Sequence, residues 1–385
     1  MSEMSYLEKL LDGVEVEWLP LGEVSVLRRG RVMSKGYLTE NFGPYPVYSS
    51  QTANNGKIGS INTFDFDGEY ISWTTDGANA GTVFYRTGKF SITNVCGLIT
   101  LKSKYPLIYK FLFYWLTIEA KKHVYSGMGN PKLMSHQVEN IPVPIPCPDN
   151  PEKSLAIQSE IVRILDKFTE LTAELTAELT MRKKQYNYYR DQLLSFKEGE
   201  VEWKTLGTFA DNFDSLRKPI TSGLRETGNI PYYGASGIVD YVKDYIFDDD
   251  LLLISEDGAN LIARNTPIAF SISGKTWVNN HAHVLKFKNH TEQKFVEYYL
   301  NNINLTPYIS GAAQPKLNKK NLESIRIPNP SLKEKEQIVT ILDKFDALTN
   351  SITEGLPREI ELRQKQYEYY RDLLFSFPKP ETVSN

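Results

Sequence analysis

The chain has 385 residues, of which 41% are hydrophobic and 24% are charged, as in a globular protein with more than one domain. No apolar run reaches the roughly 18 residues of a membrane span, no signal-peptide pattern opens the sequence, and the two cysteines form no CxxC pair, so we expect a cytoplasmic protein without structural zinc or disulfides. The net charge of −3 is unfavourable for nucleic-acid binding in bulk, so any DNA contact must come from local basic loops or from partner subunits.

The first predicted unit is a mixed α/β domain over residues 14–150, preceded by a helical stub at residues 1–13. The domain is rich in Tyr, Phe, Thr, Val, Gly and Pro, and it contains short β-like runs such as residues 69–74. A helical patch follows around residues 107–124. A proline-rich stretch at residues 142–151 then ends the domain.

A long helix is predicted over residues 151–198. Its apolar positions, from Ile157 to Phe196, advance in alternating steps of four and three residues, which is typical of a helix that packs along a partner helix. Near its middle, Thr-Ala-Glu-Leu occurs twice in succession, and a four-residue insertion of this kind locally unwinds a coiled coil without breaking it. The repeat consists of Thr172, Ala173, Glu174 and Leu175, followed by Thr176, Ala177, Glu178 and Leu179.

The second half of the chain repeats the first. Residues 199–330 form a second mixed domain and residues 331–377 a second long helix, followed by a tail at residues 378–385. Gly355 and Pro357 should kink or restart this second helix. Ordered matches across nearly the whole chain indicate duplication. The clearest pairs are Val16-Glu17-Trp18 with Val201-Glu202-Trp203, Asp76-Gly77-Ala78-Asn79 with Asp257-Gly258-Ala259-Asn260, Pro131-Lys132-Leu133 with Pro315-Lys316-Leu317, and Leu165-Asp166-Lys167-Phe168 with Leu342-Asp343-Lys344-Phe345.

These patterns predict an α+β protein with two pseudo-symmetric mixed α/β domains, separated by two long antiparallel helices that form a coiled coil. Residues 6–11 resemble the last turns of the first long helix, so the N-terminus should pack beside the end of the second helix. At about 1.5 Å per residue, a helix of about 45 residues is a rod of roughly 65 Å. Two similar domains held apart by such rods suit a reader of two half-sites on one face of a duplex.

The sequence resembles the specificity subunits of type I restriction and modification enzymes over essentially all of its length. The most specific features are the duplicated Gly-x-x-x-Pro-Lys-Leu segment before each long helix and the Thr-Ala-Glu-Leu tandem, which resembles the IC subfamily in particular. The resemblance implies two target-recognition domains, each reading one half of a bipartite DNA site. It also implies that the repeat number sets the spacer between the half-sites, since one repeat adds about 6 Å of helix and a net turn of about 40°.

The same resemblance implies partners that perform the chemistry. Two methyltransferase (M) subunits would dock on the helices, and motor and nuclease (R) subunits would complete the complex. S-adenosylmethionine, ATP and Mg would be bound by those subunits, and we expect no cofactor and no metal in this chain.

Basic and short polar side chains in the loops are the candidate DNA contacts. Arg and Lys can hold phosphates or reach a guanine edge, and Ser, Gln and Asn offer hydrogen bonds to base edges. The alternatives are solvated charges and, for Asn-Asn-Gly, a simple turn. We expect the repeated Asp-Gly-Ala-Asn to be structural, because two domains that read different sequences do not need identical base contacts. The candidates are Arg28, Arg29, Arg31, Lys35, Ser49, Ser50, Gln51, Asn54, Asn55 and Lys132 in the first domain, and Arg217, Lys218, Ser236, Lys316, Lys319 and Lys320 in the second.

Tyrosines near the end of each long helix have two predicted roles. Those on the apolar seam favour packing against the partner helix, and the outward residues beside them are candidates for partner docking. The seam residues are Tyr186, Tyr189, Tyr367 and Tyr370, and the docking candidates are Tyr188, Arg190, Tyr369 and Arg371.

Signals of catalysis are weak. Gly274-Lys275-Thr276 ends like a phosphate loop, but Ala269 stands where the first glycine should be. His281 and His283 would share one face of a strand, as metal ligands might, although a structural or base-contacting role is favoured. Without a methyltransferase Asn-Pro-Pro-Tyr motif, the sequence predicts a non-enzymatic DNA-recognition subunit. The alternatives are a self-contained two-lobed DNA-modifying enzyme and a purely structural coiled-coil scaffold.

Overall fold

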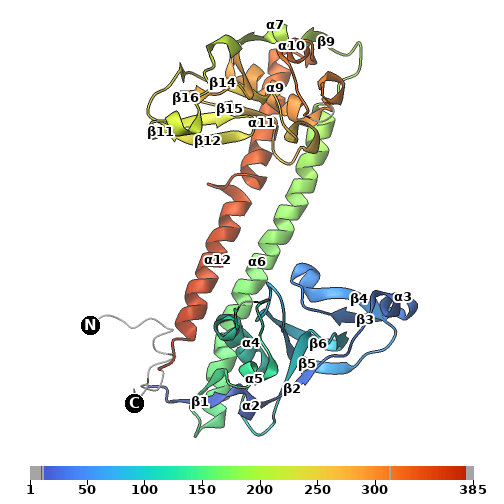
Figure 1. The fold of residues 1–385 in the computed structure, drawn as a ribbon, viewed down its shortest axis with the longest axis vertical. Helices are drawn as coiled ribbons and strands as arrows, with labels where there is room; N and C mark the ends of the chain where they lie inside the picture. The colour runs from blue at the N-terminus through green and yellow to red at the C-terminus, as the bar shows by residue number, and fades with distance from the viewer. Residues whose placement is uncertain (1–9, 11–12, 128, 312–313, 379–385) are drawn as a thin grey trace. The chain divides into compact units, whose positions relative to one another are not determined.

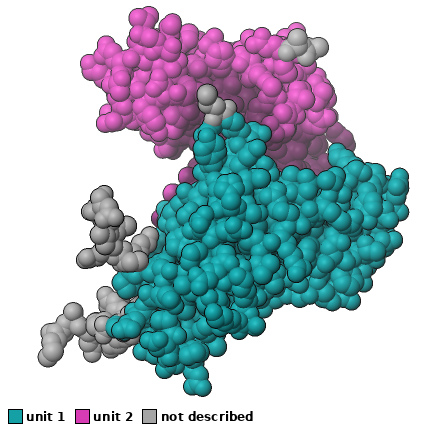
Figure 2. Space-filling view, turned by 60° about the horizontal axis from the view of Figure 1, so that its bottom comes forward, with its two compact units in different colours: residues 1–174, 360–385 teal, residues 175–359 magenta. Residues whose placement is uncertain are grey.

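The structure is a computed structural model, and it describes residues 10, 13–127, 129–311 and 314–378. The chain divides into two compact units, which Figure 2 colours separately: unit 1 contains residues 1–174 and 360–385, and unit 2 contains residues 175–359. Most of the predicted N-terminal stub lies outside the described residues. No helix among the described residues is long and apolar enough to cross a membrane.

A six-stranded sheet forms the body of unit 1, in the order β2-β7-β5-β6-β3-β4 (Figure 1). Its neighbouring strands are antiparallel, except that β3 and β6 are parallel. A separate antiparallel pair, β1 with β8, joins the start of the domain to its end. The strands are β1 (Val16–Pro20), β2 (Ser25–Arg29), β3 (Phe42–Tyr48), β4 (Lys57–Ile61), β5 (Phe66–Thr74), β6 (Val83–Ile92), β7 (Cys96–Leu101) and β8 (Pro142–Pro146).

Helix α4 packs against this sheet and completes the core of unit 1. Its buried face carries Phe111, Leu112 and Trp115, which share a hydrophobic cluster with Trp73 of β5. The Trp115 indole N–H also donates to the carbonyl of Pro142 at 2.7 Å, so the polar end of this buried ring is satisfied. The helical elements of unit 1 are α2 (Leu21–Val24), α3 (Lys35–Glu40), η1 (Ala53–Gly56), α4 (Tyr109–Glu119), η2 (Ala120–His123), α5 (Ser135–Val138) and the first part of α6 (Pro151–Leu193).

Unit 2 follows the same plan, with the sheet divided into β10-β17-β14-β15 and β12-β11-β16-β13. Gly274, with φ +74°, turns the chain between β15 and β16, whereas its counterpart Gly88, with φ +78°, lies inside the continuous strand β6. A parallel pair, β11 with β16, and a separate pair, β9 with β18, recur as in unit 1. The strands are β9 (Glu202–Thr205), β10 (Ala210–Asn212), β11 (Thr227–Gly234), β12 (Gly237–Val242), β13 (Phe247–Asp248), β14 (Leu251–Ser255), β15 (Ala269–Ile272), β16 (Lys275–Val278), β17 (Ala282–Phe287) and β18 (Arg326–Asn329).

Helix α9 takes the place of α4 in the core of unit 2. It buries Phe295, Val296 and Leu300 in one cluster with residues of β14 and α11. The Asn289 side chain caps its first turn by accepting from the amide of Glu292. The helical elements are α7 (Leu206–Phe209), η3 (Asp214–Leu216), η4 (Ser222–Leu224), α8 (Asn260–Ala263), α9 (His290–Asn302), η5 (Thr306–Tyr308), α10 (Lys319–Glu323), α11 (Leu332–Thr349) and α12 (Gly355–Leu374), of which residues 360–374 belong to unit 1.

In each unit, a segment of α6 packs antiparallel to a segment of the second helical arm. In unit 1, Phe168 stacks on Tyr370 with ring centroids 5.3 Å apart, and earlier residues of α6 share a cluster with later residues of α12. In unit 2, Tyr189 stacks on Phe345 of α11 at 5.7 Å, and the end of α6 shares a cluster with the start of α11. The aromatic residues therefore occupy the seam positions predicted from the spacing, and the α+β fold with paired helices is confirmed.

The second helical arm breaks where Gly355 and Pro357 predict. Helix α11 ends at Thr349 and α12 begins at Gly355. Gly355 has φ +74°, and a Cβ at this position would lie 2.3 Å from the carbonyl oxygen of Ala347. Only glycine allows this turn, so the arm restarts there instead of continuing.

Leu10 and residues 14–18 lie against the segment that follows α12, whereas most of residues 6–11, for which this contact was predicted, lie outside the described residues. The Trp18 indole N–H donates to the carbonyl of Pro378 at 2.9 Å. Leu10 and Val14 pack in the same cluster as Phe375. The first domain is thus held against the end of the second helical arm.

Candidate nucleic-acid interface

Five loops of unit 1 hold one another through hydrogen bonds. The amide of Asn94 donates to the carbonyl of Arg31 at 3.1 Å. The carbonyl of Val95 accepts from the amide of Thr75 at 3.2 Å and from the Ser50 hydroxyl. These loops contain most of the DNA-contact candidates of the first domain. We call them loop cluster 1, which contains residues 29–31, 49–51, 75–77, 93–95 and 131–133.

The arginines of loop cluster 1 are anchored to different degrees. Arg29 donates to the carbonyl of Asn94 at 2.7 Å, and Arg31 pairs with Asp65 at 3.0 Å. Both guanidinium groups remain close to the surface, where they can still meet a phosphate. The candidates with exposed side chains and no role in these bonds are Arg28, Lys35, Asn54 and Asn55.

The polar loop before β4 has two parts. The side chains of Ser49, Ser50 and Gln51 form hydrogen bonds within unit 1 and thereby fix the loop. Asn54 and Asn55 are left-handed, with φ of +50° and +53°, a conformation that asparagine tolerates well. The two asparagines therefore form the predicted turn, and the same turn exposes their side chains.

Unit 2 contains an equivalent group of loops. The amide of Glu256 donates to the carbonyl of His281 at 2.9 Å, and the amide of Lys218 donates to the carbonyl of Val278 at 3.3 Å. The Ser255 hydroxyl donates to the carbonyl of Ala235 and so joins the β11–β12 turn to the group. We call these loops loop cluster 2, which contains residues 213–218, 234–236, 256–258, 279–281 and 315–317.

A network of charged side chains underlies loop cluster 2. Arg217, with only 13% of its side chain exposed, donates to Glu256 at 2.6 Å, and Lys316 pairs with Glu256 at 3.1 Å. His283 lies 2.6 Å from Asp214 and is almost fully buried. Arg217 therefore holds the loops together through its ion pairs, and its predicted contact with DNA stays a prediction.

The carboxylates of this network are stabilised in their charged form. Burial opposes ionisation of Asp214, but the hydrogen bond and charge of His283 outweigh burial and hold the pKa of Asp214 below its ordinary value. Burial likewise opposes ionisation of Glu256, and Arg217 and its neighbours lower the pKa of that carboxyl. Asp214, Glu256 and His283 lie close enough together to surround a cation. Because Arg217 and Lys316 already neutralise the carboxylates, we interpret the group as an ion-pair network.

The two motifs repeated in both units pair with each other. Asp76 forms a β-bridge with Lys132, and Asp257 forms the same bridge with Lys316. In unit 2 the amide of Gly258 also donates to the carbonyl of Pro315. In unit 1 the amide of Gly77 donates in the same way to the carbonyl of Pro131. Asp-Gly-Ala-Asn and Pro-Lys-Leu are therefore the two sides of one shared frame, on which Lys132 and Lys316 are displayed.

Each unit anchors this frame with a different side chain. The Trp73 indole N–H donates to the carbonyl of Leu133 at 3.0 Å, and His283 Nε2 lies 2.6 Å from the carbonyl of Leu317, the matching residue. A Cβ at Gly97 would lie 2.1 Å from the Trp73 ring. His283 occupies the place of Gly97, so a tryptophan on one strand and a histidine on its neighbour perform the same task.

The remaining candidates of unit 2 lie on or near loop cluster 2. Lys316 is about half exposed although it pairs with Glu256. Ser236 lies in the tight turn between β11 and β12. The candidates with exposed side chains are Lys218, Ser236, Lys316, Lys319 and Lys320.

The docking candidates occupy equivalent positions on the helices of their own units. Tyr188 in unit 2 is 62% exposed, and Tyr369 in unit 1 is 65% exposed. Arg190 lies over the ring of Tyr186, 5.6 Å from its centroid, and Arg371 has the same relation to its neighbouring seam tyrosine. Each unit thus presents an outward tyrosine beside an arginine that a ring holds in place.

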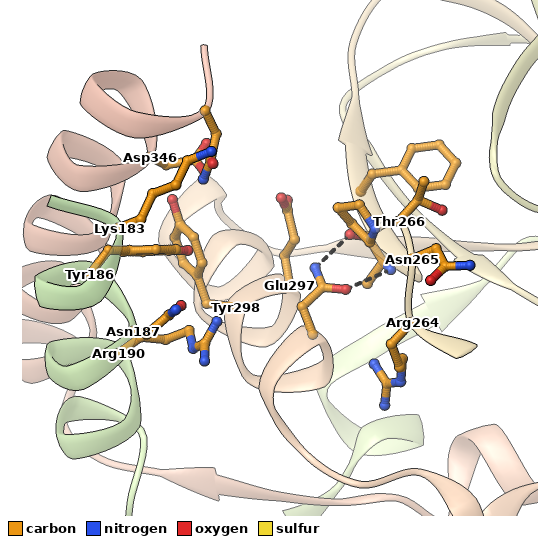
Figure 3. A pocket seen from close by; sticks show the side chains of 15 residues that line it. Lys183, Tyr186, Asn187, Arg190, Arg264, Asn265, Thr266, Glu297, Tyr298 and Asp346 are labelled. Carbon is orange, nitrogen blue, oxygen red and sulfur yellow. Dashed lines mark hydrogen bonds between the residues drawn. The ribbon is translucent and has the colours of Figure 1, made fainter. Parts of the chain in front are cut away.

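Unit 2 also has a polar pocket of about 510 Å³ between α6, α9, α11 and the loop before β15 (Figure 3). Its polar groups bond mainly to the protein itself. The Tyr298 hydroxyl donates to Asp343 at 2.6 Å, and Glu297 pairs with Lys294 at 2.8 Å. Arg264 donates to main-chain carbonyls at the end of α9. The lining residues therefore connect α9 to α11, through Tyr298 and Asp343, and to the loop before β15, through Arg264.

Sequence reasoning missed the residues that shape the loop clusters. Trp73, Thr75 and Asn94 carry no motif, and Asp214 precedes a candidate arginine without any mark of its own. The repeat itself was a usable signal for two of them, because Trp73 and Thr75 lie directly before the repeated Asp-Gly-Ala-Asn.

Comparison with known proteins agrees with this architecture. A family model described as the type I restriction modification DNA specificity domain matches residues 13–181 and 198–362. The EcoR124I/EcoR124II specificity subunit of Escherichia coli is 43% identical over all of both chains. The EcoprrI specificity subunit of Escherichia coli is 41% identical over 92% of this chain and 93% of its own.

A solved structure shares the fold. The S subunit of a type I restriction-modification system from M. genitalium matches 98% of this chain and 100% of its own, with a TM-score of 0.66 at 19% identity. The family model and the two relatives confirm the family predicted from the sequence, whereas the assignment to the IC subfamily stays a prediction. The chain belongs to the family of type I restriction-modification DNA specificity subunits.

Proposed function

We propose that this chain reads a bipartite DNA sequence, with one half-site recognised by each unit. The observation that carries the proposal is the pair of loop clusters. They share one frame, made by the repeated Asp-Gly-Ala-Asn and Pro-Lys-Leu motifs, and they display different side chains on it. A shared frame with different readers is what two unequal half-sites require.

The exposed basic side chains would contact the DNA backbone, and the short polar ones the base edges. In unit 1, Lys132 stands on the frame and Asn54 and Asn55 project from a turn. In unit 2, Lys316 takes the position of Lys132, and Ser236 lies in a two-residue turn. The further cations assigned to the backbone are Arg28, Arg29, Arg31, Lys35, Lys218, Lys319 and Lys320.

The helices would set the distance between the half-sites and carry the partners. Helix α6 is continuous from Pro151 to Leu193, and the boundary of the compact units, between residues 174 and 175, falls inside the tandem repeat. Each further copy would lengthen the helix by about 6 Å. The exposed tyrosines Tyr188 and Tyr369, with the partly exposed arginines Arg190 and Arg371 beside them, would dock one methyltransferase subunit in each unit.

The chemistry would then belong to other chains of a cytoplasmic complex. Methyltransferase subunits would bind S-adenosylmethionine, and motor and nuclease subunits would use ATP and Mg. The relative from Escherichia coli that spans this whole chain is named a specificity subunit of a type I restriction enzyme, which supports this division of labour.

The experiment is to express the chain together with its methyltransferase subunits and to map methylated adenines across a genome. We expect one asymmetric sequence of two defined halves and an undefined spacer. Methylation without sequence preference would contradict the proposal and favour a structural scaffold. Tight binding of S-adenosylmethionine by the chain alone would favour a self-contained enzyme.

Partner docking has a separate test. Tyr188→Ala and Tyr369→Ala should each weaken binding of methyltransferase subunits about tenfold or more, because exposed tyrosines are frequent interface anchors. Met181→Ala, at an exposed position two turns earlier on α6, serves as the control. Unchanged binding in both tyrosine variants would contradict the docking assignment.

A further inference from the structure

His281 is a half-exposed side chain of loop cluster 2 that its surroundings hold in one orientation. Its Nδ1 lies 3.0 and 2.9 Å from the two carboxylate oxygens of Asp257, while 51% of the side chain is exposed. Its amide donates to the Asn279 side chain at 2.8 Å, and its carbonyl accepts from Glu256 at 2.9 Å. The turn and the ring are therefore both fixed before any ligand arrives.

The second ring nitrogen is left for a ligand. Because Asp257 engages Nδ1, Nε2 lies on the opposite edge of the imidazole ring, away from the carboxylate. Within the described part of the chain, Nε2 forms no hydrogen bond. An oriented imidazole with one edge bonded and the other open can form a directional hydrogen bond to a partner.

Unit 1 has the same turn without this side chain. Val95 holds the equivalent position, and its carbonyl accepts from Thr75 at 3.2 Å just as that of His281 accepts from Glu256. The frame aspartate is present in both units as Asp76 and Asp257. The backbone is thus shared and only the projecting side chain differs, which is the pattern expected of a residue that distinguishes two half-sites.

The neighbours of His281 suit a nucleic acid. Asp257, which orients it, is bridged through its backbone to Lys316, whose side chain is 50% exposed. Ser236 is exposed in the same loop cluster. A lysine that can hold a phosphate near an oriented imidazole places a sequence-independent and a directional group in one surface.

We propose that His281 reads a base edge in the major groove of the half-site recognised by unit 2, and that Asp257 is its positioning residue. This inference rests on the proposed function. The chemistry is one hydrogen bond at Nε2, which donates to guanine N7 or O6 when the imidazole is protonated and accepts from an adenine or cytosine amino group when it is neutral. The base whose recognition is lost identifies which of these applies.

The test is to compare His281→Ala, His281→Gln and Asp257→Ala with the wild type, each co-expressed as the full chain with its methyltransferase subunits, by mapping methylated adenines. We expect preference at one position of the unit 2 half-site to fall about tenfold in His281→Ala, since one good base contact discriminates by this order. Asp257→Ala should reduce the preference at the same position by less than His281→Ala does. The double variant, with both Asp257→Ala and His281→Ala, should reduce it no more than His281→Ala alone. The other half-site should stay unchanged, and the exposed His290→Ala is the matched control.

The opposing results are equally specific. A loss of affinity that is uniform across sequences, with a smaller salt dependence, would show a phosphate contact and overturn base reading. Unchanged preference in His281→Ala would also overturn it. His281→Gln, at a half-exposed position, guards against a folding defect, and unfolding temperatures are compared for all variants. If the wild type itself shows no bipartite preference, the proposed function has failed, which is distinct from failure at His281 alone.

Discussion

The two units solve one structural problem with different residues. In unit 1, Trp73 on β5 fills the space above Gly97 and donates to Leu133. In unit 2, the smaller Ile254 takes the place of the tryptophan, and His283 reaches the matching carbonyl from the neighbouring strand. The frame is therefore preserved by an exchange of large and small side chains across a strand pair, and the surface above it is free to differ.

The two units also use different kinds of interaction to anchor the frame. Unit 1 anchors its frame with a buried aromatic ring and one hydrogen bond. Unit 2 anchors it with a charged network of Asp214, Arg217, Glu256 and His283. Two units built on the same plan should accordingly respond differently to mutation and to pH.

The largest expected effect is in unit 1. Trp73→Ala should lower the free energy of unfolding by about 3 to 5 kcal/mol, because it removes a fully buried indole and leaves a cavity. Trp73→Phe keeps most of the volume and should cost about 1 to 2 kcal/mol for the lost hydrogen bond. Denaturant unfolding of the full chain checks both values, and a Trp73→Phe variant as stable as the wild type would show that the hydrogen bond to Leu133 is not the anchor.

Unit 2 should respond to the loss of charge. His283→Ala leaves buried Asp214 without its nearest cation, and breaking a buried pair typically costs about 3 to 5 kcal/mol, an effect that the nearby Arg217 should reduce here to about 2 to 3 kcal/mol. His290→Ala, at an exposed position, should stay within about 0.5 kcal/mol. Calorimetry of both variants measures this difference. Equal stability of the two would mean that the network contributes nothing to unit 2.

Acid should separate the two units. The pKa values of Asp214 and Glu256 are lowered in the folded state, so their contribution to stability is fully present above the ordinary carboxyl pKa of about 4 and is lost as pH falls through the lowered values. Loop cluster 2 should therefore exchange its amide hydrogens faster below about pH 4, relative to loop cluster 1. Hydrogen exchange resolved by peptide tests this, and equal acceleration in both clusters would be the contrary result.

The smallest effect should be the same in both units. Lys132→Ala and Lys316→Ala remove equivalent cations from the shared frame. Each should weaken DNA binding uniformly across sequences and reduce the slope of log affinity against log salt by about 1. Binding of the assembled complex to DNA at several salt concentrations measures this. A change in sequence preference in either variant would instead assign that lysine to base reading.

The sequence was sufficient for the parts that depend on periodicity and repetition. The alternating spacing of apolar residues in α6 predicted the seam that Phe168 and Tyr189 occupy, and Gly355 predicted the break between α11 and α12. Both signals are local, because helix periodicity and glycine conformation are properties of neighbouring residues. The duplicated motifs then predicted two domains of one fold.

The parts that depend on packing across strands could not be predicted. Arg217 and Lys218 form one basic run in the sequence. Yet the Arg217 side chain is largely covered and pairs with Glu256, whereas Lys218 is exposed. For His283 the sequence favours a structural or base-contacting role over a metal ligand, and only the contact with the Leu317 carbonyl shows which carbonyl the side chain anchors. Burial of a charged residue is decided by partners distant in sequence, and no local pattern carries that information.

Exchange of the first recognition domain is the strongest test that each half-site is read independently. Residues 14–150 would be replaced by those of another family member with a known and different site, and methylated adenines would be mapped with the same methyltransferase subunits. We expect one half of the recognised sequence to change to that of the donor while the other half and the spacer stay the same. A simultaneous change in both halves would contradict it.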